Sequence, residues 1–379
     1  MPQNHWEDYA DKALQDLALT RVEGRAVLEA SADQTLGLVA AAYRVRQRYF
    51  GRRIRLNYLL NAKSGLCPED CHYCSQSKSS TAPIDKYPWL SVEETLKMAD
   101  RAVATHAGRF CMVASGRGPS DRELGHVVEC VKAVRERHPR LEICCCLGLL
   151  SDGQADALKD VGVFAVNHNL NTSERFYGDI CQTHTYADRV GTVQKVKQAG
   201  LSACSGALVG MGETLDDILD LGFALREIGV ESLPVNFLMP IPGTPLENMG
   251  LESRVPGSND ARPETRDARP VVLTPTRCLN ILCFFRFLNP RASLRISGGR
   301  EIHLRSLQTL GLYIANSIFI GDYLTTKGQP AEADLAMIRD MGFEIERDGV
   351  PSPASRVPGV GPIVELKTRD ARLETRDRL

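Results

Sequence analysis

The spacing of apolar residues changes along the chain from a helical pattern to an alternation of strands and helices. In residues 1–50 the apolar positions recur at roughly helical spacing, which predicts a helical extension. From residue 51 onward, short apolar runs alternate with longer amphipathic segments. The predicted strands are 54–60, 109–114, 141–147, 162–167, 201–208, 231–237, 292–296 and 316–320. The predicted helices are 91–107, 122–138, 153–160, 185–199, 214–228, 276–288 and 302–311.

Strands that alternate with helices in this way favour a parallel (β/α)8 barrel of the TIM type over residues 51–345, rather than an open doubly wound sheet. Periodicity alone does not separate a closed barrel from an incomplete one. In either architecture we expect the active site at the C-terminal ends of the strands.

Two segments that are poor in large apolar residues share repeated peptides. Residues 253–269 contain Ser-Arg-Val-Pro-Gly and then Thr-Arg-Asp-Ala-Arg, and residues 355–372 contain the same pentapeptides in the same order. Segments of this composition cannot form a core. We expect a low-complexity insert at 252–270 and a low-complexity tail at 346–379, both disordered and outside the barrel. A partner-binding arm is the less favoured alternative.

Composition and charge exclude several classes of partner. The net charge of -1 gives no general attraction to nucleic acid or to an anionic membrane. The N-terminal residues lack the pattern of a signal peptide, and no apolar run is long enough to span a bilayer. We therefore expect a reducing cytoplasmic location, where the 12 cysteines indicate metal or catalytic sites.

Three of these cysteines, Cys67, Cys71 and Cys74, form a C-x3-C-x2-C set in the loop after the first predicted strand. Three thiolates this close can converge on an iron–sulfur cluster, zinc or Cu(I). A structural zinc site and a fully ligated cubane cluster both require four protein ligands, so three thiolates leave one iron open. The alternatives are three unrelated thiols or a zinc knuckle completed by His72. Ligation through His72 would strain the loop, because this residue lies between two of the cysteines.

A second group of cysteines lies on three neighbouring predicted strands. It comprises Cys111, the run Cys144 to Cys146, and Cys204. One buried cysteine is commonly a small hydrophobic residue, but cysteines on three successive strands suggest a second inorganic site. Because side chains alternate along a strand, Cys144 and Cys146 share a face and Cys145 points the other way, towards the outer helices.

Further polar residues lie near the ends of the predicted strands. Arg295 stands in an apolar strand, where a lone charge is costly, so we expect a buried carboxylate or a ligand anion beside it. Asn167, His168, Asn169 and Asn171 follow the fourth strand, and Asn236 ends the sixth. Taken alone, His168 is better interpreted as structural than as a ligand-binding residue.

The combination of motifs resembles biotin synthase, a family of the radical S-adenosylmethionine (SAM) superfamily. The three-cysteine loop, with Tyr73 before its last cysteine, is similar to the superfamily motif. The more specific matches cover about residues 40–345 and include Gly65 to Ser77, Arg109 to Met112, Asn167 to Leu170, Thr185 to Arg189, Cys204 to Thr214, Gly243 to Leu246, Arg295 to Glu301 and Gly311 to Thr326.

The resemblance implies a (β/α)8 barrel enzyme that uses SAM to insert sulfur into dethiobiotin and so makes biotin. It implies that Cys67, Cys71 and Cys74 hold a [4Fe-4S] cluster that binds SAM and allows its cleavage to methionine and a 5′-deoxyadenosyl radical. It also implies a [2Fe-2S] cluster that donates sulfur, with the ligands Cys111, Cys144, Cys204 and Arg295.

The resemblance further assigns binding residues and partners. Tyr73, Asn169, Asn171 and Arg189 match positions near SAM, and Asn169 and Asn236 match positions near the ureido ring of dethiobiotin. The implied partners are a flavodoxin or ferredoxin reductant and a second copy of the chain in a homodimer.

Two departures from the family pattern stand out. Many members carry aspartate where this chain has Asn171, and Cys145 and Cys146 leave the nuclearity of the second cluster open. The competing hypotheses are another radical SAM enzyme on the same barrel, such as a carbon-skeleton mutase or a maturase relative, and a non-enzymatic iron–sulfur or zinc protein. The second cysteine set with Arg295 argues against the first competitor.

Overall fold

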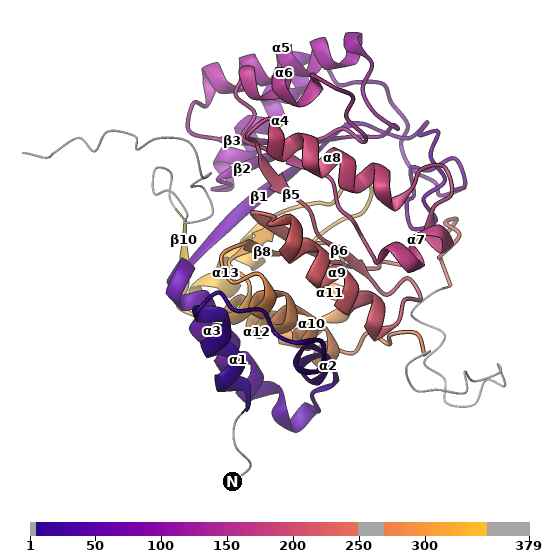
Figure 1. Cartoon of the computed structure of the whole chain (residues 1–379). Helices are drawn as coiled ribbons and strands as arrows, with labels where there is room; N and C mark the ends of the chain where they lie inside the picture. The colour runs from indigo at the N-terminus through magenta and orange to yellow at the C-terminus, as the bar shows by residue number, and fades with distance from the viewer. Residues whose placement is uncertain (1–4, 249–268, 347–379) are drawn as a thin grey trace, which may run out of the picture.

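The computed structural model describes residues 5–248 and 269–346 (Figure 1). Most of the expected insert at 252–270 and nearly all of the expected tail at 346–379 lie outside the described residues. Their predicted disorder therefore stays a prediction.

Parallel strands close into a barrel, as the sequence pattern predicts. Each strand pairs with the next around the ring, and the last strand pairs with the first through Arg55 and Ser317. The ring consists of β1 (Arg53–Lys63), β2 (Arg109–Ala114), β3 (Glu142–Cys146), β4 (Ala165–Asn167), β5 (Ser202–Cys204), β6 (Ala207–Val209), β7 (Ser232–Phe237), β8 (Ser293–Ile296) and β9 (Ser317–Phe319). Because β5 and β6 are the two halves of one predicted strand, the architecture is a closed (β/α)8 barrel. The short β10 (Glu344–Ile345), which pairs with the start of β1, was not predicted.

The break between β5 and β6 occurs where the chain comes very close to β7. A Cβ atom on Gly206 would lie 1.9 Å from the carbonyl oxygen of Pro234, so a side chain cannot be accommodated there. Ser205 nevertheless keeps its backbone bond to β7, since its N–H donates to the carbonyl of Ser232 at 3.0 Å. Glycine thus lets the strand bend without leaving the barrel wall.

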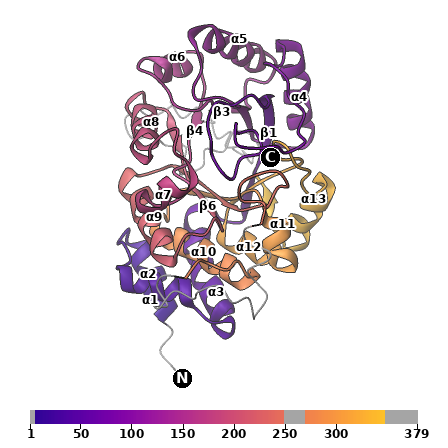
Figure 2. The same cartoon turned by 90° about the vertical axis from the view of Figure 1, so that its right-hand side faces the viewer.

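Most outer helices match the predicted ranges and form a ring around the strands (Figure 2). Side-chain caps explain several starts: Ser91, Ser120, Thr185 and Thr214 each form a capping box. The matching helices are α4 (Val92–Ala104), α5 (Asp121–Arg137), α6 (Gln154–Asp160), α8 (Tyr186–Gln198), α9 (Leu215–Ile228) and α10 (Pro275–Leu288).

Three details of the helix prediction were wrong. The predicted helix 302–311 is broken, because Arg305 has a positive φ of 52°. The segment instead forms α11 (Arg300–His303), the 3-10 turn η4 (Arg305–Leu307) and α12 (Gln308–Ile314). The other two details are missed helices, α7 (Glu174–Ile180) and α13 (Ala331–Asp340).

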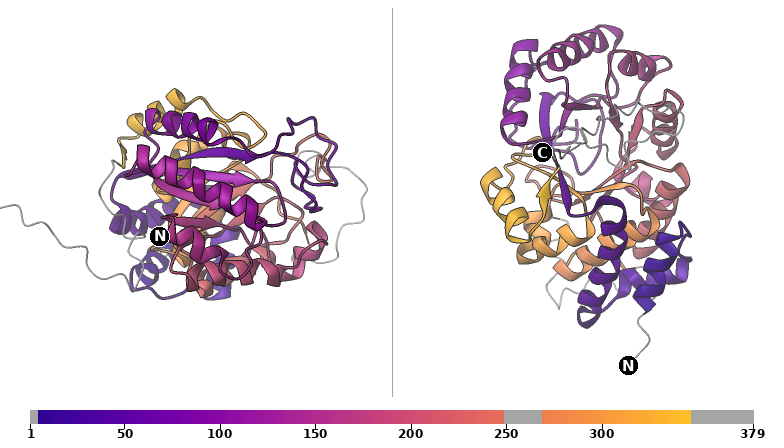
Figure 3. Two further views of the ribbon diagram at one scale, coloured as in Figure 1. Left: turned by 90° about the horizontal axis from the view of Figure 1, so that it is seen from above. Right: turned by 90° about the vertical axis from the view of Figure 1, so that its left-hand side faces the viewer.

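The predicted N-terminal helices pack against one side of the barrel, mainly on α10 and α12 (Figures 1 and 3). They are α1 (His5–Leu14), α2 (Arg21–Glu29) and α3 (Thr35–Phe50), with a 3-10 turn η1 (Ala32–Gln34) before α3. Consequently α10 is buried on all sides, and its Arg286 donates to the backbone carbonyls of Ile314, Pro290 and Ala292. Burial, with the nearby charge of Arg46, lowers the pKa of Arg286 to about 9.

Ion pairs connect the starts of the strands at the N-terminal end of the barrel. Glu142 accepts hydrogen bonds from Arg55 at 2.7 Å and from Arg109 at 2.8 Å, and Arg55 also pairs with Glu346. The polar groups at this end are therefore mutually compensated.

The described part of the chain contains no helix that is both long and apolar enough for a membrane span.

We predict that Gly206→Ala lowers the free energy of unfolding by roughly 3 kcal/mol, because the added methyl group clashes with a strand backbone that cannot move freely. Gly125→Ala in α5 is the matched control. No atom lies within 4 Å of its added methyl group, so this change should stabilise the helix by about 1 kcal/mol. Denaturant unfolding measures both, and equal stability of the two variants would contradict the close-approach argument.

Candidate active site

A cavity of about 380 Å³ opens at the C-terminal ends of the strands, where the fold predicts an active site. The lining includes nearly all of the residues that the sequence singled out, although they come from distant parts of the chain. These are Cys67, Cys71, Tyr73, Cys74, Cys111, Cys144, Asn169, Asn171, Arg189, Asn236 and Arg295. Cys204 is not part of the lining and lies behind it, 1% exposed.

The cysteine loop follows β1 and is fixed by hydrogen bonds at both ends. The N–H of Gly65 donates to Gln76 at 2.9 Å, and the Ser115 hydroxyl donates to the carbonyl of Gly65 at 2.6 Å. All three cysteines of the loop line the cavity, whereas His72 is absent from the described lining. This arrangement does not favour a zinc knuckle completed by His72.

The spacing of the loop thiols fits a cluster better than a single ion. The ligand atoms of Cys67, Cys71 and Cys74 do not all lie within 4.8 Å of one another. Among the described residues, one other set of three histidine, cysteine or acidic side chains meets that distance. Thiolates around one zinc would lie roughly 3.8 Å apart, given a Zn–S distance of about 2.3 Å. In a cubane cluster each thiolate binds a different iron, so wider spacing is expected.

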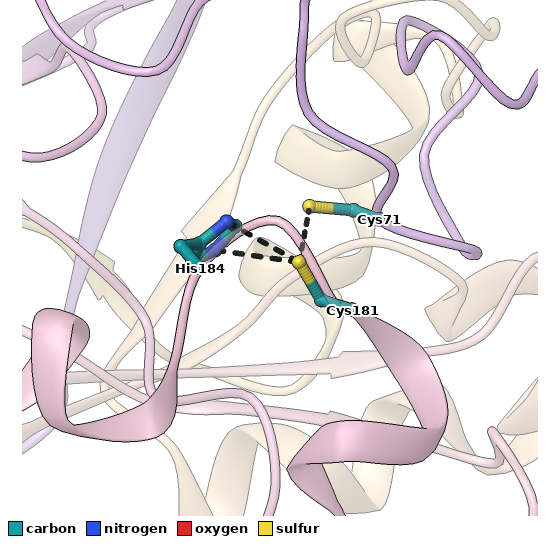
Figure 4. Close-up of side chains that lie close together, drawn as sticks. All are labelled: Cys71, Cys181 and His184. Carbon is teal, nitrogen blue, oxygen red and sulfur yellow. Dashed lines mark hydrogen bonds between the residues drawn. The ribbon is translucent and has the colours of Figure 1, made fainter.

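The close set is Cys71, Cys181 and His184, which sequence reasoning missed (Figure 4). The Sγ atoms of Cys71 and Cys181 are 3.9 Å apart, and Cys181 Sγ is 3.2 Å from His184 Nδ1. Both nitrogens of His184 have other partners: Nδ1 contacts Glu69, and Nε2 contacts Tyr177 at 2.9 Å. The set therefore positions the cysteine loop against the α7–α8 connection and is not a separate metal site.

Acidic residues of the cysteine loop strengthen this attachment. The Asp70 carboxylate accepts from the backbone N–H groups of Gln182 at 3.0 Å and Thr183 at 3.1 Å. Although burial would raise it, hydrogen bonds from Thr183, His184 and Arg117 lower the pKa of Glu69. Carboxylates of the loop thus anchor it to the α7–α8 connection beside the cavity, which Glu69 itself lines.

The residues predicted near SAM form one hydrogen-bonded network beside the loop. Asn171 donates to the Tyr73 hydroxyl at 2.7 Å, and Arg189 donates to the same hydroxyl at 3.3 Å and to the carbonyl of Asn169 at 2.7 Å. Asn171 has a φ of 70°, a left-handed conformation that asparagine tolerates better than most residues. The network places polar groups next to the cysteines.

The second cysteine set converges within the barrel. Cys111 and Cys144 are register partners on β2 and β3, and the Cys144 thiol contacts the thiols of both Cys111 and Cys204. Despite complete burial, a hydrogen bond from Cys144 and the charges of Arg295 and Arg109 lower the pKa of Cys204. The surroundings therefore favour a thiolate, the form that binds metal.

Arg295 is 1% exposed and forms no ion pair with a carboxylate of the described chain. Its Nη1 lies 4.0 Å from Cys204 Sγ, and its other nitrogens donate to the hydroxyls of Ser317 and Ser232. A buried guanidinium without an anionic partner would be costly. An anionic thiolate cluster beside it removes that cost, so the residues fit such a group.

Two neighbouring thiols behave as strand alternation predicts. Cys145 is fully buried in the main core, and Cys146 lines the cavity on the side of Cys144. Asn167, which sequence reasoning placed only at a strand end, donates to Cys204 Sγ at 3.2 Å. Its role was missed because the contact spans β4 and β5.

The asparagine and histidine groups complete the cavity wall. Asn236 donates to the carbonyl of Ala207 and accepts from the N–H of Gly298, both at 3.1 Å. His168 is 5% exposed, and its Nε2 has no hydrogen-bond partner among the described residues. Burial and the charge of Arg189 lower the pKa of His168 well below its usual value, so the ring is neutral. The buried Nε2 is therefore a polar atom that the described residues leave without a partner, and the structural interpretation of His168 stays a prediction.

Sequence comparisons decide the family. The profile of the radical SAM superfamily matches residues 63–225, and that of the Biotin and Thiamin Synthesis associated domain matches residues 234–344. Biotin synthase of Streptomyces avermitilis is 52% identical over 352 residues, which cover 93% of this chain and 85% of the relative. The chain belongs to the biotin synthase family. Biotin synthase 2 of Frankia casuarinae is 51% identical (92% and 91% covered), and biotin synthase of Bacillus anthracis is 50% identical (90% and 96%).

Solved structures support the barrel of this biotin synthase family member. Methylornithine synthase superposes with a TM-score of 0.71 at 20% identity, covering 89% of this chain and 97% of that one. The FeFe-hydrogenase maturase of Carboxydothermus hydrogenoformans superposes with a TM-score of 0.70 at 18% identity (91% and 80% covered). These two show a shared fold only. The much higher identity to biotin synthases makes the chain a radical SAM enzyme of that family.

We predict that Cys71→Ala lowers the iron content of anaerobically reconstituted protein by roughly four atoms per chain, because one of three ligands to a cubane cluster is lost. SAM cleavage should disappear with it. Cys283→Ala, in the buried face of α10, is the control and should keep its iron. Iron and sulfide analysis with electron paramagnetic resonance checks both. Unchanged iron in Cys71→Ala would show that the loop does not hold the cluster.

Proposed function

We propose that this enzyme inserts sulfur into dethiobiotin to form biotin, by a SAM-dependent radical reaction with two iron–sulfur clusters. The observation that carries the proposal is the convergence of two cysteine sets on one cavity, with the buried Arg295 beside the second set. A single metal site would not require both sets.

The residues divide into two cluster sites. Cys67, Cys71 and Cys74 would hold a [4Fe-4S] cluster with one iron left for SAM, next to the network of Tyr73, Asn171 and Arg189. Cys111, Cys144, Cys204 and Arg295 would hold a [2Fe-2S] cluster deeper in the barrel.

The reacting C–H bonds of dethiobiotin are unactivated, so acid–base residues could not break them. When bound, SAM and the clusters supply a primary carbon radical and the sulfur atom. The chain's own task is to hold the reacting groups in line and to keep water away. A closed barrel whose N-terminal end is sealed by the Arg55–Glu142–Arg109 ion pairs suits that task.

Polar groups in the cavity wall suit the ureido ring of the substrate. The amides of Asn169 and Asn236 line the cavity, and each amide offers donors and an acceptor. Neutral His168 also avoids placing a second cation next to Arg189. A volume of about 380 Å³ is within the usual range for a small-molecule site.

Other parts of the proposal rest on the family alone. They are a flavodoxin or ferredoxin reductant, a homodimeric assembly, a cytoplasmic location and the two-iron nuclearity of the second cluster. Asn171 replaces a common aspartate and would contact the SAM ribose without a charge. Its bond to Tyr73 shows how an amide is held at this position.

Product analysis tests the function. The anaerobically reconstituted protein would receive SAM, dethiobiotin and a reductant, with mass spectrometry of the products. We expect biotin together with 5′-deoxyadenosine in at least a twofold excess, because two C–S bonds form. Formation of deoxyadenosine without biotin would contradict the proposed substrate or the second cluster. The absence of both products would contradict the radical reaction.

We predict that Cys204→Ala impairs biotin formation far more than deoxyadenosine formation, because Cys204 lies in the second set and not beside the SAM network. Cys145→Ala is the matched control, because Cys145 follows Cys144 on β3 but its thiol faces the core. The ratio of 5′-deoxyadenosine to biotin should rise only in Cys204→Ala. Normal biotin yield from this variant over several turnovers would overturn the sulfur-donor assignment.

A further inference from the structure

Leu66 is exposed in a way that its surroundings do not explain. The side chain is 77% exposed, and the residue has a φ of 54°, which is unfavourable for leucine. The conformation is held firmly, because both backbone groups of the preceding Gly65 are bonded to Gln76 and Ser115. An apolar side chain is thus fixed in solvent immediately before Cys67.

Cationic residues from three segments are linked to the residues that flank Leu66 in the chain. Lys86 packs against Gly65, where an added Cβ would lie 2.6 Å from its Cγ. Arg117 follows Gly116, whose backbone bonds to the Cys67 thiol, and the N–H of Lys78 donates to the carbonyl of Glu69 at 2.9 Å. Lys78, Lys86 and Arg117 are all exposed.

The same segments carry fewer exposed carboxylates than exposed cations. Glu69 is buried and paired with Arg117 and His184. Asp85 is the exposed carboxylate beside Lys86, so exposed cations outnumber exposed anions here. We call the surface of Leu66, Lys78, Lys86 and Arg117 the Leu66 face.

Cys67 connects the Leu66 face to the first cysteine set. Cys71 is buried beneath the α7–α8 connection, at 8% exposed, and Cys67 is partly exposed directly next to Leu66. Because electron transfer slows steeply with distance, a donor protein bound over Leu66 would approach the metal site by a short path through Cys67.

We propose that the Leu66 face is the docking surface for an acidic, low-potential one-electron carrier protein. The inference rests on the proposed function, which requires one electron for each SAM cleaved. Leu66 supplies an apolar contact at the centre, and Lys78, Lys86 and Arg117 supply charge complementarity around it. Each encounter transfers one electron and no atoms: the carrier is oxidised by one electron and the cluster of the first cysteine set is reduced by one.

Charge reversal and removal of the apolar contact test the surface. The double variant Lys78→Glu/Lys86→Glu should raise the Kd and the KM for an added flavodoxin roughly tenfold and flatten their salt dependence. Leu66→Asn should weaken binding without harming the loop, because asparagine tolerates positive φ better than leucine. Lys132→Glu, exposed on α5 away from the cysteine loop, is the matched control.

Dithionite separates docking from catalysis, since a small reductant does not need the surface. Both test variants should turn over normally with dithionite and poorly with low concentrations of flavodoxin. An unchanged flavodoxin Kd in both variants would overturn the proposal, even if one variant also lost activity. The binding titration does not depend on biotin formation, so it still reports on docking if the proposed reaction fails.

Discussion

The burial of negative charge inside a closed barrel is the constraint on which the site depends. In the proposed cluster sites, thiolates that bind iron would carry charge into a region with little water, where an uncompensated charge is costly. Arg295 meets this need: it is 1% exposed, lies 4.0 Å from Cys204 Sγ and has no carboxylate partner in the described chain. A hydrogen bond from Asn167 to the same sulfur adds a second favourable contact. The strand register that aligns Cys111 with Cys144 completes the arrangement, so the barrel geometry itself assembles the second cysteine set.

The first cysteine set is organised differently, because it lies on a loop and not on strands. Its position comes from contacts with the α7–α8 connection, where Asp70 accepts backbone hydrogen bonds and Cys181 contacts Cys71. The two sets therefore combine a rigid wall with a loop that is anchored from behind. Between them lies a cavity with polar groups suited to a cofactor and a ureido substrate. A radical reaction needs this division, since the reactive species must form next to its target and away from solvent.

The sequence predicted the barrel and both cysteine sets, because strand alternation and cysteine spacing are local patterns. It failed where tertiary contacts decide. The contact of Cys181 with Cys71 joins positions 110 residues apart, and no spacing rule connects them. Helix α7, which has seven residues and packs on α8 and α9, was also missed. The interpretation of His168 as structural stays a prediction, because the structure shows only that its buried Nε2 has no partner among the described residues.

In the proposed function, the cavity would hold SAM and dethiobiotin side by side, and hydrogen would pass directly from dethiobiotin to the 5′-deoxyadenosyl radical. Isotope transfer measures this most directly, with dethiobiotin deuterated at the two carbons to which sulfur is added. Direct transfer would place deuterium in the 5′-deoxyadenosine formed during biotin production. Unlabelled deoxyadenosine, formed from the labelled substrate at a normal biotin yield, would contradict direct transfer. The hydrogen in deoxyadenosine would then come from another source.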